Sequence, residues 1–128
     1  MARVVHFEIQ ASKPKDLIAF YEALFAWKFQ QWGANDYWLI LTGADGQPGI
    51  NGGLLPRRGP PPAEGQAVNC FVCTVEVDSV DDVLATAVSL GAIVAVPKMP
   101  IQGVGWLAYF KDPDGNLVGI TRKDAKAA

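Results

Sequence analysis

The chain has 128 residues, half of them apolar, and its formal net charge at pH 7 is −2. A chain of this length can bury a core without disulfides or a structural metal. Its charge gives no electrostatic reason to expect binding to nucleic acids or to anionic membranes. No apolar run approaches the ~20 residues of a membrane-spanning helix. The N-terminus lacks the apolar core of a signal peptide, so we expect a cytoplasmic location.

The first predicted element is a strand over residues 4–10, because polar and apolar side chains alternate there. One face of this strand is apolar and consists of Val5, Phe7 and Ile9. A helix is expected next, since Pro14 suits a first turn and apolar residues then recur with helical spacing at Leu17, Phe20, Tyr21, Leu24 and Phe25. The helix should cover the apolar face of the strand and leave His6 and Glu8 on the other face.

A strand over Tyr37–Thr42 and a tight turn at Asp45–Gly46 complete the first half of the chain. Residues 56–66 then contain four prolines and two glycines, which is typical of an extended linker. We therefore expect one domain over residues 1–128 with two modules, at about 3–55 and about 67–122.

In the second half we expect a strand over Asn69–Val77 and a helix over Val80–Leu90, with Asp78 or Ser79 as its N-cap and Gly91 as its stop. Further strands are predicted at residues 93–96, 106–110 and 116–121. The segment Pro97–Gly105 is interpreted as a connecting loop, with a glycine-hinged lid as the alternative.

The only cysteines, Cys70 and Cys73, fall in the predicted strand of the second half. Strand side chains alternate between faces, so residues three apart point to opposite sides. We therefore expect two core residues and neither a disulfide nor a zinc site.

The two halves resemble each other. Ser12 matches Asp78, Trp38–Leu39 matches Trp106–Leu107, and Asp45–Gly46 matches Asp114–Gly115, always at offsets between 66 and 69 residues. A duplicated unit of this size packs against its own copy and forms a cleft where the copies meet. We expect an α+β fold of two tandem β-α-β-β-β modules with pseudo-two-fold symmetry, whose mixed sheets curl into a cup.

The repeat, the opening VVHFEI, the FYEALFAWKF helix, the GINGG segment and the GVGWLAYFKDPDGN stretch resemble the vicinal oxygen chelate superfamily. That superfamily includes glyoxalase I, extradiol dioxygenases and bleomycin-resistance proteins, and the chain is most similar to small bacterial proteins related to lactoylglutathione lyase. The resemblance covers residues 3 to about 122. It implies paired modules around a cup, a homodimer, and in the metalloenzymes a divalent ion held by one residue from each of four strands.

Carried onto this sequence, that resemblance gives an incomplete ligand set. His6 occupies the first position, but Val72 and Gly119 stand where the metalloenzymes have a His and a Glu. At the remaining position only Asn51 offers an oxygen. Since one imidazole does not retain a divalent ion, we expect no metal; if one binds, the improvised ligands are His6, Glu8 and Glu76.

Two functions remain open. The first is a metal-free protein that binds a small organic molecule, with His6, Glu8, Trp38, Asn51 and Trp106 as ligand-binding residues. The second is a lyase or isomerase of the glyoxalase type, with His6 and Glu8 as catalytic residues and either no metal or a divalent ion as cofactor. In the first function, Trp38 and Trp106 are expected at equivalent points of the two modules.

Overall fold

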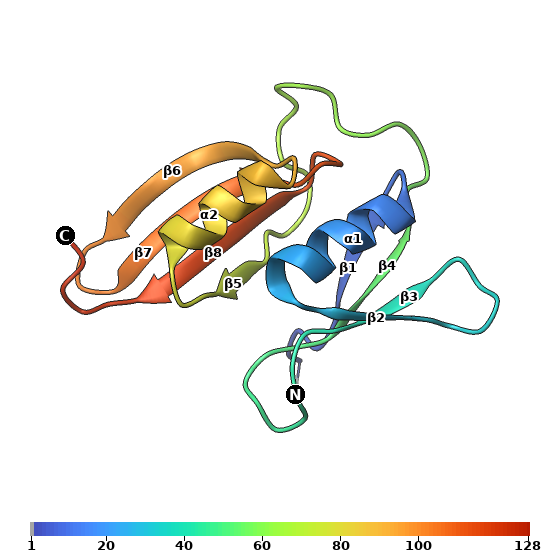
Figure 1. The fold of residues 1–128 in the computed structure, drawn as a ribbon, viewed down its shortest axis with the longest axis horizontal. Helices are drawn as coiled ribbons and strands as arrows, with labels where there is room; N and C mark the ends of the chain where they lie inside the picture. Colours follow the sequence, from blue (N-terminus) through green and yellow to red (C-terminus); the bar gives the residue numbers. More distant parts are fainter. Residues whose placement is uncertain (1) are drawn as a thin grey trace. The chain divides into compact units, whose positions relative to one another are not determined.

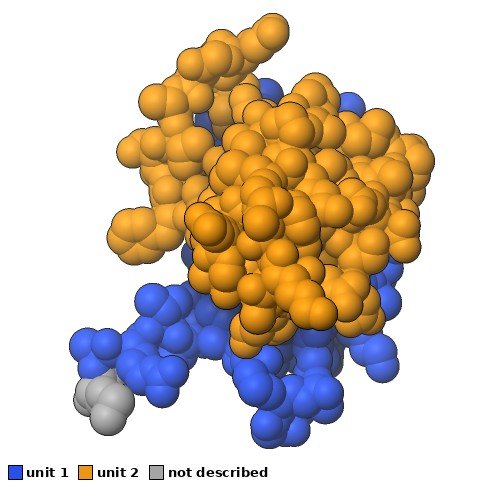
Figure 2. All heavy atoms as spheres, turned by 90° about the vertical axis from the view of Figure 1, so that its left-hand side faces the viewer, with its two compact units in different colours: residues 1–61 blue, residues 62–128 orange. Residues whose placement is uncertain are grey.

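The structure is a computed structural model that describes residues 2–128, and these form two helices and eight strands in two four-stranded sheets (Figure 1). The chain divides into two compact units, residues 1–61 and 62–128 (Figure 2). The boundary falls inside the linker expected at residues 56–66. Each unit holds one β-α-β-β-β module, so the α+β fold with tandem modules is confirmed.

The elements of the first unit are β1 (Phe7–Ala11), α1 (Pro14–Phe25), β2 (Lys28–Gln31), β3 (Trp38–Leu41) and β4 (Gly52–Pro56). The sheet order is β1-β4-β3-β2. Strands β1 and β4 run parallel, and the other neighbours run antiparallel. The parallel pair places the first and last strands of the module side by side in its sheet.

Helix α1 covers one face of this sheet. It begins at Pro14, where a missing N–H costs nothing, and ends at Phe25, because the next residue, Ala26, adopts a left-handed conformation with φ 57°. Its core-facing residues include Tyr21, which stacks on Trp27 at a ring-centroid distance of 5.3 Å. Trp27 in turn lies 6.0 Å from the ring of Phe7. Phe7 therefore faces the helix, as the sequence predicts.

The first strand is shorter than predicted. It begins at Phe7 because its partner β4 begins at Gly52, the residue that pairs with Phe7. The preceding residues have no strand partner, and Val5 is 75% exposed. The expectation that Val5 belongs to the covered face is therefore wrong, while Phe7 and Ile9 are half-buried on it.

The second unit repeats the topology. Its elements are β5 (Thr74–Glu76), α2 (Val80–Ser89), β6 (Ile93–Ile101), β7 (Gly105–Lys111) and β8 (Leu117–Lys123). The sheet order is β5-β8-β7-β6, with β5 and β8 parallel. Its core contains the fully buried side chains of Phe110 and Ile120. Ser79 caps α2, because its Oγ accepts a hydrogen bond from the Asp82 N–H at 3.1 Å.

Strand β6 occupies most of the segment expected to be a loop or lid. It extends to Ile101 despite Pro97 and Pro100. An edge strand tolerates proline, because one side of its backbone has no neighbour to pair with. The register between β6 and β7 also shifts between Val94 and Val96 and again between Val96 and Met99.

The predicted strand over Asn69–Val77 is formed only at β5. Residues 69–73 lie outside it, although the Gly119 N–H donates to the Cys73 carbonyl at 3.0 Å. Phe71 is 97% exposed, and Cys70 and Cys73 are also exposed. The interpretation of both cysteines as core residues is therefore wrong, because the alternation on which it rests does not extend to them.

Within residues 2–128, neither helix is long and apolar enough to cross a membrane. The longer of the two, α1, has 12 residues.

Candidate functional site

The register of the first sheet defines the face on which His6 and Glu8 lie. Glu8 pairs with Gly53, and Gly53 pairs with Leu39, so these three residues share one face. Their immediate neighbours along the strands belong to the opposite face, which α1 covers. We call the uncovered side the His6 face; its side chains are His6, Glu8, Gln10, Tyr37, Leu39 and Leu55.

Three of these side chains form a hydrogen-bonded cluster. His6 Nε2 lies 3.0 Å from Tyr37 Oη. Tyr37 donates its hydroxyl proton to Glu8 Oε2 at 3.1 Å. The direct distance from His6 Nε2 to Glu8 Oε2 is 3.6 Å, and the two side chains are 47% and 44% exposed. The structure thus brings together the predicted pair and inserts Tyr37 between its members.

Tyr37 was not predicted as a site residue. Its position depends on Gly53, because a Cβ at Gly53 would collide with Tyr37 Oη. A glycine within a strand is a signal for the close approach of another group. The GINGG segment carried that signal, but the sequence did not say which aromatic residue lies there.

In the second unit a glycine again lies against a tyrosine, but this tyrosine corresponds in register to Leu39 and not to Tyr37. Gly119 pairs with Thr74 and Tyr109, as Gly53 pairs with Glu8 and Leu39. A Cβ at Gly119 would lie 2.8 Å from Thr74 Oγ1 and 3.0 Å from the ring of Tyr109. Thr74 therefore takes the place of Glu8, and the second unit has no counterpart of the charged cluster.

The environment of Tyr37 keeps its hydroxyl neutral. Partial burial, the hydrogen bond to Glu8 and the charge of Glu8 all raise the pKa of Tyr37 above its ordinary value of 10.0, burial being the largest cause. Tyr37 is therefore a proton donor at physiological pH and stays one well into alkaline solution.

The structure separates Trp38 from this cluster. Trp38 pairs with Leu54, which is fully buried, so its indole lies on the face that α1 covers. The expected equivalence of the two tryptophans is also wrong. The strand register matches Leu54 with Ile120, and Ile120 pairs with Ala108, so Trp38 corresponds to Ala108 and not to Trp106.

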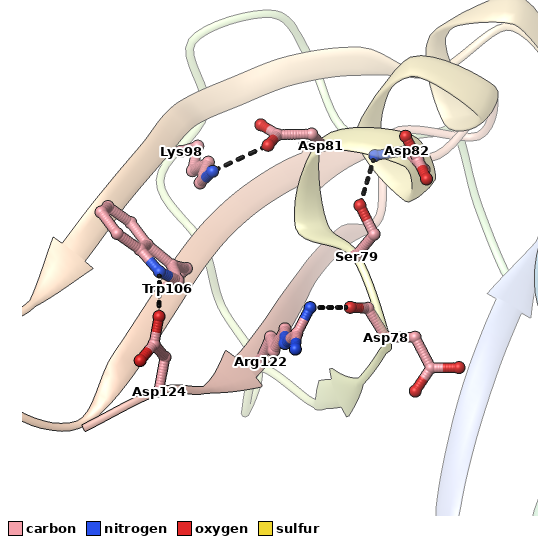
Figure 3. Close-up of polar contacts among 8 residues, drawn as sticks. All are labelled: Asp78, Ser79, Asp81, Asp82, Lys98, Trp106, Arg122 and Asp124. Atoms are coloured by element: carbon pink, nitrogen blue, oxygen red, sulfur yellow. Dashed lines mark hydrogen bonds and ion pairs between the residues drawn. The ribbon is translucent and has the colours of Figure 1, made fainter. Parts of the chain in front are cut away.

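Trp106 belongs to β7 and lies on the helix-covered face of the second sheet, near Lys98 and Asp124 (Figure 3). Its indole N–H donates to Asp124 Oδ2 at 3.1 Å, and Lys98 Nζ lies 4.7 Å from its ring centroid. Lys98 also pairs with Asp81 at 2.8 Å. These residues line a shallow depression of about 210 Å³ together with Ser79, Val80 and Arg122.

Asp124 is held in its charged form at this place. The Lys126 backbone N–H, the Trp106 indole and the Arg122 charge lower the pKa of Asp124, and its small desolvation opposes them. Most groups around Trp106 are thus already paired with one another. This arrangement has the character of a structural anchor for the end of β8.

Asn51 also has a structural role. Its Oδ1 accepts from the Thr42 backbone N–H at 2.9 Å and from Thr42 Oγ1 at 3.3 Å. The side chain thereby closes the connection between β3 and β4. Its oxygen is occupied and does not join the cluster at His6.

Residues 3–120 match the model of the glyoxalase/bleomycin resistance protein/dioxygenase superfamily. The chain belongs to this superfamily. The resemblance inferred from the sequence is therefore confirmed at the level of the superfamily. No curated protein matches the chain.

Several solved structures share the fold of this chain. A family enzyme from Burkholderia phytofirmans has a TM-score of 0.72 at 14% identity, over 96% of this chain and 100% of that one. TioX from a Micromonospora species has a TM-score of 0.68 at 16% identity, over 96% and 100%. A variant of the fosfomycin resistance protein FosX from Listeria monocytogenes, in complex with Mn(II) and a dihydroxypropylphosphonic acid, has a TM-score of 0.70 at 18% identity, over 94% and 90%.

Two positions at which the metalloenzymes of the superfamily have a ligand carry no donor side chain in this chain, Val72 and Gly119. The space at Gly119, where a terminal ligand is expected, is filled by Thr74 and Tyr109. Glu76 pairs in register with Thr121 and lies 3.9 Å from Lys123 Nζ, so it does not correspond to Glu8. Within residues 2–128, no three His, Cys, Asp or Glu side chains are grouped closely enough to hold a metal.

Proposed function

We propose that this member of the superfamily binds a small organic molecule on the His6 face of its first sheet. The polar end of the ligand would contact the cluster of His6, Tyr37 and Glu8, and an apolar part would lie against Leu39 and Leu55. The observation that carries the proposal is the hydrogen-bonded cluster itself. It gathers groups able to orient a ligand on a face that α1 leaves uncovered.

The chemistry of this face supports an amphipathic ligand. Sites for small molecules combine apolar walls with a few fixed polar groups. Here Leu39 pairs with Gly53 directly beside Glu8, and both leucines are only half-buried. The molecule bound to FosX is likewise a compact organic molecule, and its two hydroxyl groups are hydrogen-bond donors.

We propose that binding requires no divalent metal. The one imidazole of the chain is hydrogen-bonded to a tyrosine, Val72 and Gly119 lack a donor side chain, and the Asn51 oxygen is bonded to Thr42. Ligand recognition would then rest on hydrogen bonds and on apolar contact. Trp38, Asn51 and Trp106 do not belong to the proposed site, because their side chains are engaged elsewhere or lie on the other face.

The test is a screen of small organic molecules by amide chemical shifts of the ¹⁵N-labelled protein. Binding should shift amides of β1, β3 and β4. The variant Tyr37→Phe keeps the ring and removes one hydroxyl, so affinity should fall about fivefold, the effect of one hydrogen bond. The control Trp106→Phe should bind as the unchanged protein does. Shifts confined to β6–β8, or an effect of Trp106→Phe alone, would refute this site.

A lyase or isomerase of the glyoxalase type is the second candidate. The observation that favours it is the connection of His6 through Tyr37 to a carboxylate, which holds an imidazole in one orientation for proton transfer. His6 and Glu8 would then be catalytic. A His6→Ala variant that still binds a substrate but no longer converts it would establish the enzyme.

We also propose a homodimer. Exposed apolar side chains are frequent in both units, among them Val4, Val5, Phe71, Ile93 and Val104. Each sheet also ends in edge strands, β1 and β2 in the first sheet and β5 and β6 in the second, and such edges are templates for pairing with another chain. Association of two copies would cover part of this surface.

A further inference from the structure

The directions of the hydrogen bonds in the His6 cluster follow from which of its three side chains carry a proton to donate. Tyr37 Oη carries one proton and lies 3.1 Å from Glu8 Oε2 and 3.0 Å from His6 Nε2. A carboxylate only accepts, so the tyrosine proton points to Glu8. The tyrosine oxygen must then accept from His6, and this requires a proton on Nε2.

This assignment leaves the other ring nitrogen available. A neutral imidazole has one N–H, and the second nitrogen carries a lone pair. The hydrogen bond and the ion pair that His6 forms with residues 2–128 are both made through Nε2. About half of the His6 side chain is exposed, and Nδ1 is the ring nitrogen left to accept a hydrogen bond from a ligand.

We propose that His6 Nδ1 accepts a hydrogen bond from the ligand, and that the ligand is an uncharged molecule in which a hydroxyl or N–H donor adjoins an apolar group. This inference rests on the proposed function and specifies its ligand class. A phenol or an enol has the required donor. A carboxylate or phosphonate offers only lone pairs to Nδ1.

The charge of Glu8 also favours an uncharged ligand over an anion. The Glu8 carboxylate lies 3.6 Å from the imidazole and disfavours a second anion beside it. Arg57, which follows β4, donates to the Gln10 carbonyl toward the other end of β1. The cluster thus combines an acceptor at Nδ1 with negative charge behind it.

A proton on His6 Nε2 is also incompatible with a metal ion bound to that nitrogen. A metal ion on Nε2 would need the lone pair of that nitrogen, and His6 would then lose its bond to Tyr37. The hydrogen-bonded cluster and a metal on Nε2 are therefore mutually exclusive.

The tautomer can be measured without any ligand. His6 is the only histidine, so a long-range ¹H–¹⁵N spectrum contains a single imidazole. At mildly alkaline pH we expect the shifts of a protonated Nε2 and an unprotonated Nδ1. Tyr37→Phe should move both shifts toward the average of the two tautomers, because the acceptor is lost. A proton found on Nδ1 in the unchanged protein would overturn the inference whether or not a ligand binds.

The ligand class is tested with para-cresol, its methyl ether and para-toluate. We expect para-cresol to bind at least about fivefold more tightly than the ether, which lacks the donor, and more tightly than the anionic toluate. Toluate binding best on the His6 face, or equal affinities of cresol and ether, would overturn this inference and keep the proposed function. If none of the three shifts the amides of β1, β3 or β4 while another molecule of the screen does, this inference is overturned and the proposed function stands.

Discussion

The close contact between Gly53 and Tyr37 predicts what an added methyl group would do. In Gly53→Ala the Cβ would collide with Tyr37 Oη, and Cε1 of the ring would lie only 2.9 Å away. Gly53 does not have a positive φ, so alanine fits the backbone there. The tyrosine must therefore rotate away, and it loses its bonds to His6 and Glu8.

The expected change in stability is small. Two exposed hydrogen bonds contribute about 0.5–1.5 kcal/mol each. Alanine also restricts the conformations of the unfolded chain, and this raises the free energy of unfolding by about 0.4–1 kcal/mol. The net loss in the free energy of unfolding should be about 1 kcal/mol.

The neighbouring substitution Gly52→Ala is the matched control. Its Cβ would meet the backbone carbonyl of Phe7 and, at 2.8 Å, the ring of the same residue. A carbonyl in a paired strand cannot rotate away, so this variant should lose about 2–3 kcal/mol. Its substituent points to the α1 side and leaves Tyr37 in place.

Chemical denaturation and tyrosinate absorbance measure both effects. Gly53→Ala should lower the pKa of Tyr37 toward 10.0, since burial and the bond to Glu8 are lost; Gly52→Ala should not. The raised pKa means that this stabilisation is complete below pH 10.0 and disappears as pH rises through the pKa of folded Tyr37. An unchanged Tyr37 pKa in Gly53→Ala, or equal destabilisation by both variants, would contradict the described packing.

Three further predictions concern stability, metal and assembly. Ser79→Ala should reduce the free energy of unfolding by about 1 kcal/mol, because the Asp82 N–H loses its cap; an unchanged denaturation midpoint would refute the cap. Elemental analysis of protein purified without a histidine tag should find no stoichiometric divalent metal; about one ion per chain would favour the enzyme with His6, Glu8 and Glu76 as ligands. Light scattering at micromolar concentration should give twice 13.7 kDa, whereas a monomer at every concentration would exclude the dimer.

The sequence predicts the fold well where two signals coincide. Both helices begin where predicted, since Pro14 and Ser79 mark starts that the apolar spacing then continues. The strand limits are less predictable, because they depend on the partner strand. The first strand begins where Gly52 offers a partner, and β6 continues through two prolines because it lies at an edge.

The candidate site is predictable only in part. Alternation along one strand placed His6 and Glu8 together, and the structure adds Tyr37 from another strand. The sequence offset between the two halves matched Trp38 with Trp106, and this match was misleading. The connections before β3 and β7 differ in length, whereas β4 and β8, the last strands of the two modules, pair in the same register. Local pattern indicates which face a residue occupies, whereas the neighbour across the sheet depends on register.

The central claim is that the ligand lies on the His6 face of the first sheet. A crystal structure of the protein with the tightest ligand from the screen tests it most directly. The account predicts a ligand donor within hydrogen-bond distance of His6 Nδ1, the bond from Tyr37 to Glu8 intact, and apolar contact with Leu39. A ligand bound instead beside Trp106, with the His6 cluster untouched, would contradict it.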